Sequence, residues 1–143
     1  DNKEAETGYA VVYSGIDSIE LSAGYFDDGD EAENNTAGIK FTMGQLTAAY
    51  QRTEVDYAKT TKDQEADHYG ASIAINDSFS ISAGQQNIEF DGAAEDEKNS
   101  GVMASYTIGS ISMGGGFNKL ENKGGASSAK DVEASIFNIS FAF

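Results

Sequence analysis

The sequence contains no cysteine, proline or tryptophan, and its 143 residues include a single histidine. Without cysteine there can be no disulfide framework, no thiolate metal site and no cysteine nucleophile. No stretch approaches the roughly 20 consecutive apolar residues of a membrane-spanning helix. The first residues, Asp1 to Glu6, do not have the composition of a signal peptide, so we expect that any targeting segment has been removed.

Positive charge is also scarce, because 9 basic side chains face 24 acidic ones and the formal net charge is -15. This balance argues against nucleic-acid binding, which depends on neutralising phosphates, and against a basic helix lying on an anionic membrane. The length predicts a single unit over residues 1–143 with no separate soluble domain. The mean hydropathy of -0.43 is typical of a soluble protein. A membrane β-barrel has equally low values, because its strands alternate apolar and polar residues.

Apolar residues recur at every second position along most of the chain. In the last segment, Phe137, Ile139 and Phe141 alternate with Asn138 and Ser140. Successive side chains of a strand point to opposite faces, so this pattern predicts a strand with one apolar face and one small, polar face. Repeated along the chain, it predicts about nine strands of roughly 8–12 residues and no helix.

Short and long connections alternate between these strands. The tight turns are expected near Gly15–Ser18, Gly44–Gln45, Asn76–Ser78 and Gly109–Ser110. The long polar loops are expected at 27–35, 53–67, 89–99 and 120–131. This order puts all tight turns at one end of an antiparallel up-and-down sheet, which is the layout of an outer-membrane barrel. A soluble sandwich would have Greek-key crossings and irregular loop lengths.

The composition of the two faces predicts a transmembrane β-barrel. The charges cluster in the loops, and a lipid-facing charge near the bilayer midplane would cost about 2–4 kcal/mol. The side chains expected to face lipid are Tyr9, Leu21, Tyr25, Ile39, Phe41, Tyr50, Ile73, Phe79, Ile81, Tyr106, Met113, Phe117, Phe137, Ile139, Phe141 and Phe143. The side chains expected to line a pore are Glu20, Ser22, Lys40, Thr42, Thr47, Gln51, Ser72, Ser80, Ser82, Gln86, Ser105, Ser112, Asn118, Asn138 and Ser140. The aromatic residues near the strand ends fit two interfacial girdles, although aromatics also favour strands in general.

Charged side chains offer a few further candidates. Glu20 and Lys40 share the polar face, where they would set the field of a lumen or form an ion pair between adjacent strands. Arg52 lies on the apolar face near a loop, where its stem could reach the lipid headgroups. We expect His68 to be an exposed rim residue, since nothing fixes a Ser-His-Asp arrangement around it.

One loop holds weak candidates for Ca²⁺, because carboxylate oxygens suit that cation. These candidates are Asp27, Asp28, Asp30, Glu31 and Glu33. They lack the spacing of an EF-hand, so a solvated loop is the simpler interpretation and no firm metal or cofactor site is expected. In a looser form of the idea, divalent cations would bridge the acidic loops to anionic lipopolysaccharide.

The C-terminal strand, Glu133 to Phe143, resembles the terminal strand of Gram-negative outer-membrane proteins. It ends in Phe143, with Phe141, Ile139 and Phe137 at the alternating positions before it. In that family this strand is the sorting signal for the barrel-assembly machinery. In pattern the whole chain resembles the C-terminal part of a general diffusion porin of the alphaproteobacterial type. Such porins have about 16 strands, so the resemblance implies that the N-terminal remainder of the barrel is missing from this sequence.

The resemblance implies a trimeric channel of the bacterial outer membrane, in contact with lipid and lipopolysaccharide, through which small hydrophilic solutes and ions diffuse passively. The acidic loops suggest cation preference. A non-conducting structural or adhesive barrel that presents acidic loops is an alternative, and so is a soluble Ca²⁺-binding β-protein. We expect no enzymatic role, because no catalytic constellation stands out.

Overall fold

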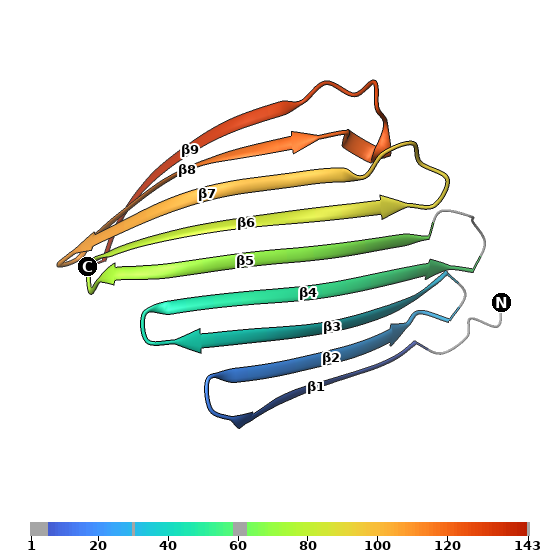
Figure 1. The fold of residues 1–143 in the computed structure, drawn as a ribbon, viewed down its shortest axis with the longest axis horizontal. Helices are drawn as coiled ribbons and strands as arrows, with labels where there is room; N and C mark the ends of the chain where they lie inside the picture. The colour runs from blue at the N-terminus through green and yellow to red at the C-terminus, as the bar shows by residue number, and fades with distance from the viewer. Residues whose placement is uncertain (1–5, 30, 59–62, 143) are drawn as a thin grey trace.

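The computed structural model describes residues 6–29, 31–58 and 63–142, so Asp30 and Phe143 lie outside the described residues. These residues form one antiparallel sheet of nine strands that pair strictly in sequence order (Figure 1). The strands are β1 Thr7–Ile16, β2 Ile19–Asp27, β3 Ala32–Met43, β4 Leu46–Tyr57, β5 Gln64–Asn76, β6 Phe79–Phe90, β7 Glu97–Ile108, β8 Ile111–Glu121 and β9 Val132–Phe141. The predicted up-and-down topology and strand number are confirmed.

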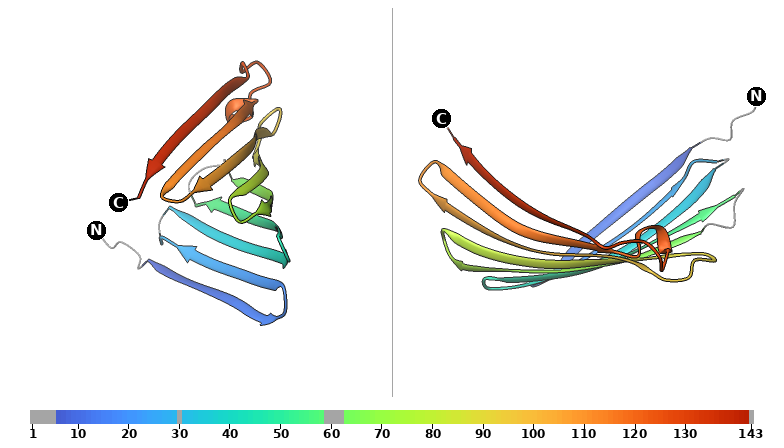
Figure 2. Two further views of the ribbon diagram at one scale, coloured as in Figure 1. Left: turned by 90° about the vertical axis from the view of Figure 1, so that its left-hand side faces the viewer. Right: turned by 90° about the horizontal axis from the view of Figure 1, so that it is seen from above.

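The sheet is strongly curved and remains open. Figure 2 shows β1 and β9 bending toward the same side, so that the sheet has a hollow, concave face and a convex face. No helix among the described residues has the length and hydrophobicity to cross a membrane. The described part contains one short 3-10 turn, Lys123–Gly125, in the loop between β8 and β9.

Two-residue turns join the strands at one end of the sheet. Gly44 and Gly109 adopt positive φ angles of 59° and 56° there, a conformation that glycine reaches without steric cost. At the β5–β6 turn the Asn76 side chain accepts hydrogen bonds from the backbone N–H groups of Ser78 and Phe79, both at 2.9 Å. The predicted tight turns are therefore confirmed.

Three of the long loops are shorter than predicted. The β2–β3, β4–β5 and β6–β7 connections occupy 28–31, 58–63 and 91–96, whereas the sequence pattern suggested 27–35, 53–67 and 89–99. The strands continue into charged segments, because ladder hydrogen bonds form whatever the side chains are and charged side chains beyond an apolar band are solvated.

The sheet has no core of its own. Among the described residues no apolar side chain is buried, and Tyr9, Phe117 and Phe137 expose 68%, 69% and 71% of their surface. Large contiguous apolar surfaces are rare on soluble monomers and mark contacts with other molecules or with lipid. The open sheet therefore needs a further surface to cover its apolar face.

Two adjacent glycines in β8, Gly115 and Gly116, are expected to differ sharply in how much their replacement by alanine destabilises the fold. A Cβ built on Gly116 would lie 2.5 Å from the carbonyl oxygen of Val102, whereas one on Gly115 would have its nearest neighbours at 3.7 Å. We expect Gly116→Ala to lower the free energy of unfolding by about 1–3 kcal/mol, because the β7–β8 ladder must shift. Gly115→Ala should change it by less than about 0.5 kcal/mol. Urea unfolding of both variants tests this, and equal stabilities would contradict the tight approach of β7 and β8.

Candidate functional site

The strand register separates the side chains into two faces, with register shifts only beside the β1–β2 and β5–β6 turns. The residues expected to face lipid share one face of the sheet, where Leu21 pairs with Ile39, Ile39 with Tyr50, and Ile73 with Ile81. The predicted pore-lining residues all occupy the opposite face, where Thr42 pairs with Thr47. Phe143 is the one member of either set outside the described residues. The register groups both sets as the sequence suggested, and what each face meets stays a prediction.

The polar face is the concave one. The 3-10 turn lies on the hollow side of the sheet in both views of Figure 2. It contacts two residues whose strand positions belong to the polar face. The backbone N–H of Gly124 donates to Glu97 Oε2 at 2.7 Å, and a Cβ built on Gly125 would lie 3.3 Å from Phe90 Cδ2. The small and polar side chains therefore line the hollow, and the apolar face is convex.

A continuous polar row crosses the concave face. Neighbouring strands pair Ser22 with Gly38, Gly38 with Gln51, Gln51 with His68, and His68 with Gln86. The expectation that His68 is an exposed rim residue is wrong, because the residue is half-buried within β5. Sequence reasoning placed it at the junction between a long loop and a strand, and so missed that β5 begins before it. Its two cross-strand neighbours are glutamines rather than a serine and a carboxylate, an arrangement without a nucleophile.

Charge is sparse on the concave face. Within the described strands, three formally charged side chains occupy it, and these are Glu20, Lys40 and Glu97. Lys40 Nζ lies 2.7 Å from Glu20 Oε1, with 45% and 38% of the side chains exposed. Both interpretations of this pair therefore fit the structure, since it bridges β2 and β3 and also stands in the hollow. Such a hydrated pair contributes about 0–1 kcal/mol to stability, so its main effect is on the local field.

The convex face is divided by a sharp boundary. Toward the turns, every described residue on this face is apolar or glycine, and toward the long loops the face becomes charged. The last apolar residues before the charged zone are Tyr9, Tyr25, Ala37, Tyr50, Tyr69, Ala83, Val102, Phe117 and Phe137, one in each strand from β1 to β9. Two pairs of these residues stack, because the ring centroids of Tyr9 and Tyr25 and of Tyr50 and Tyr69 are both 5.4 Å apart.

This boundary runs obliquely to the strands. Tyr9 pairs with Tyr25, but Tyr25 pairs with the polar Asn35. The last apolar residue of β3 is therefore Ala37, two residues closer to the turns. Such two-residue shifts occur at four of the eight steps between neighbouring strands and always in the same sense, which averages one residue per strand. With about 3.3 Å per residue and about 4.8 Å between strands, a level boundary then requires strands tilted by about 35°.

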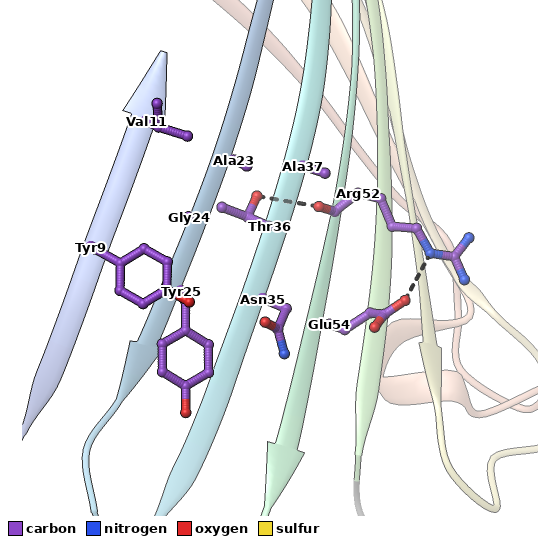
Figure 3. A pocket seen from close by; sticks show the side chains of 10 residues that line it. All are labelled: Tyr9, Val11, Ala23, Gly24, Tyr25, Asn35, Thr36, Ala37, Arg52 and Glu54. Atoms are coloured by element: carbon purple, nitrogen blue, oxygen red, sulfur yellow. Dashed lines mark hydrogen bonds and ion pairs between the residues drawn. The ribbon is translucent and has the colours of Figure 1, made fainter. Parts of the chain in front are cut away.

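Arg52, which lies beyond the boundary, is held by carboxylates. The guanidinium of Arg52 pairs with Glu65, with Glu54 at 3.2 Å and with Asp67 at 3.6 Å. Figure 3 shows Arg52 of β4 extended toward Glu54, with Tyr9 on β1 and Tyr25 on β2. Arg52 thus lies at the loop-side end of the apolar face, as predicted, and is paired with acidic side chains.

The acidic loop does not assemble a metal site in the part of the chain that is described. No group of three His, Cys, Asp or Glu side chains there is arranged to hold a metal ion. The Asp27 carboxylate accepts the Gly29 N–H at 2.7 Å, and Asp28 accepts the N–H groups of Glu31 and Ala32. These carboxylates stabilise the turn, and Ca²⁺ binding stays a prediction that includes Asp30, outside the described residues.

Comparison with known proteins identifies the fold. No family model and no curated protein sequence matches the chain. A solved porin structure superposes with a TM-score of 0.77 at 18% identity, covering 92% of this chain and 50% of the porin. A mutant of Rhodopseudomonas blastica porin gives 0.71 at 16% identity over 96% and 46%. The outer-membrane expressed OmpT of Vibrio cholerae gives 0.67 at 14% identity over 94% and 53%. The chain spans about half the length of these proteins and has the fold of half a porin barrel.

Proposed function

We propose that this chain forms about half of the wall of a water-filled channel in the bacterial outer membrane, through which small hydrophilic solutes and ions diffuse passively. The convex face meets lipid, and the predicted pore-lining residues on the concave face meet water. One observation carries the proposal: the apolar band of the convex face is free of charge and its edge is oblique to the strands. The tilt of about 35° that this edge requires falls within the range of about 35–45° in membrane barrels.

The contrast between the faces also favours an aqueous interior. The apolar face of a soluble barrel would turn inward, and its outer face would carry charged side chains to meet water. Here the concave face carries mostly small and polar side chains, the charged Glu20, Lys40 and Glu97, and a few large apolar ones such as Phe26, Met103 and Ile136. In the convex band every described residue is apolar or glycine. Because lipid offers no partners for backbone groups, a spanning sheet must close into a barrel.

Strand direction limits what can close this barrel. With nine strands in up-and-down order, the edge strands β1 and β9 run in the same direction. Closure with antiparallel pairs alone therefore needs an odd number of additional strands. Seven strands from an N-terminal remainder would bring the nine present to about 16, the porin size. A direct β9-to-β1 seam between two copies would instead be parallel.

The remaining assignments follow from the same proposal. The terminal Ile139 and Phe141 pattern suits recognition by the barrel-assembly machinery, and the charged zone beyond Tyr50 would face lipopolysaccharide. We propose a homotrimer without cofactor or catalytic role. Divalent cations could bridge the acidic loops to lipopolysaccharide phosphates, because both surfaces are anionic.

Planar-bilayer recording of the closed barrel that contains this chain tests the proposal. We expect stable open steps in salt solution and, under a salt gradient, a reversal potential that indicates cation preference. A barrel that inserts without open steps would be a structural or adhesive protein, and a chain that stays in solution without detergent would be a soluble β-protein. Anion preference would contradict the role given to the acidic loops.

A further inference from the structure

The β8–β9 loop, residues 122–131, folds over the concave face instead of extending away from the sheet. Its 3-10 turn, Lys123–Gly125, contacts the loop-side ends of β6 and β7. Figure 2 shows the turn on the hollow side of the sheet. If the hollow is a channel, this loop stands at its mouth.

Several hydrogen bonds fix the turn in place. The Gly124 N–H donates to Glu97 Oε2 at 2.7 Å, and Asn122 Nδ2 donates to the carbonyl oxygen of Asp96 at 3.2 Å. The Glu95 N–H donates to the carbonyl oxygen of Gly125 at 3.3 Å. Glu97 is thus the side chain that holds the turn from the concave face, through a bond to a charged acceptor, which is the stronger kind.

Gly125 gives the turn a close fit against the β6–β7 connection. It has a φ angle of 72° and is buried, which is rare in this open sheet. A Cβ at this position would lie 2.5 Å from the Cβ of Ala93 and 2.9 Å from the carbonyl oxygen of Glu95. Both the conformation and the space therefore require glycine.

The base of the loop is also held. Lys119 Nζ lies 2.9 Å from Glu121 Oε1 and 3.0 Å from Asp131 Oδ2. Asp131 closes the loop just before β9 begins, so this lysine joins the two strands that the loop connects. Both the tip and the base of the loop are thus attached to the sheet.

We infer that the β8–β9 loop is a fixed constriction of the channel mouth, that Glu97 is its positioning residue, and that Lys123 acts on the ions that pass it. The inference rests on the proposed channel function. Around the mouth, the β6–β7 connection carries Asp91, Glu95 and Asp96, so Lys123 introduces a positive charge into an acidic entrance. The loop thereby weakens the cation preference that the acidic loops confer.

This chain contains no cysteine, so single cysteines introduced into it provide a direct test in the closed barrel. Lys123→Cys and Lys98→Cys remove the same charge, but Lys98 lies on the convex face next to Glu97. A negatively charged thiol reagent should lower the open-channel current of the position-123 variant. It should also raise its cation-to-anion permeability ratio by about fivefold, the factor that a unit charge about 4 Å from a passing ion exerts in water. In the position-98 variant the reagent should change neither the current nor the permeability ratio. Equal changes in the two variants would overturn the inference.

Proteolysis tests the attachment without any recording. Glu97→Ala should make trypsin cleave after Lys123 about tenfold faster, because the loop then opens more often. Glu95→Ala is the matched control, since it removes the same charge and the Glu95 side chain makes none of these loop contacts. Equal cleavage rates would show that Glu97 does not hold the loop. If even the parent barrel gives no open steps, the channel proposal fails, while the cleavage rates still decide whether the loop is fixed.

Discussion

Replacing Ile73 with arginine is expected to lower the stability of the folded barrel in lipid vesicles by about 2–4 kcal/mol. Ile73 lies in β5 on the convex face, between Leu46 and Ile81 on the neighbouring strands. Ile73 lies within the apolar band, two residues closer to the turns than Ala71. The guanidinium of an arginine at this position would be forced into the hydrocarbon region. Urea-dependent folding into vesicles, followed by gel mobility, measures the change.

The adjacent residue provides the control. Ser72→Arg puts the same side chain in the same strand but on the concave face, where Ser72 pairs with Thr47 and Ser82. Its folding should stay within about 0.5 kcal/mol of the parent, and its single-channel conductance should fall because the arginine enters the lumen. If Ser72→Arg were the more destabilising substitution, the assignment of the faces would be inverted.

Reversing the charge of Lys40 is expected to produce the largest change in ion selectivity. Lys40 is the only lysine or arginine on the concave face of the described strands. Its Nζ atom lies 2.7 Å from Oε1 of Glu20 on the neighbouring strand. Lys40→Glu changes the local charge by two units. At about 4 Å from a passing ion, one unit contributes about 1 kcal/mol in water, so two units contribute about 2 kcal/mol and the cation-to-anion permeability ratio should rise more than tenfold at low salt. Reversal potentials under a salt gradient measure it.

Salt screening and a matched substitution show whether the change in ion selectivity comes from the local charge at Lys40 or from the overall charge of the protein. The shift should shrink in 1 M salt, where the Debye length is about 3 Å. Lys40→Gln should give about half of the shift in reversal potential. That result would also show that repulsion between Glu20 and the new carboxylate is not the cause. Lys98→Glu makes the same charge change on the convex face. A shift as large as that of Lys40→Glu would show that the concave face does not line the conducting path.

The alternation of side chains predicted most of this fold because a two-residue period leaves no freedom once one face is buried. Phe137, Ile139 and Phe141 determine the orientation of β9, and the pairing with β8 follows from that. The ends of the strands were harder to predict. His68 and Asp67 look like loop residues, yet both lie in β5, because pairing with β4 continues beyond the apolar band.

The conformation of the β8–β9 loop could not be predicted from the local sequence. Gly124 and Gly125 suggest a turn, but the direction in which it folds depends on Glu97 and Phe90, which come from other strands. Likewise, the oblique edge of the apolar band is visible only once the register connects Tyr25 with Asn35 and Ala37 with Arg52. Contacts between distant segments carry this information, and no local pattern contains it.

Labelling of single cysteines along β5 tests the central claim most directly, and this chain has no cysteine of its own. Variants at Ala71, Ser72, Ile73 and Ala74 would be probed in intact bilayers with a water-soluble maleimide and with a thiol reagent confined to the lipid. We predict strict alternation, with positions 72 and 74 labelled from water and positions 71 and 73 labelled from the lipid. Protection of positions 71 and 73 from both reagents would mean that a protein core covers the convex face, and the channel proposal would then be wrong.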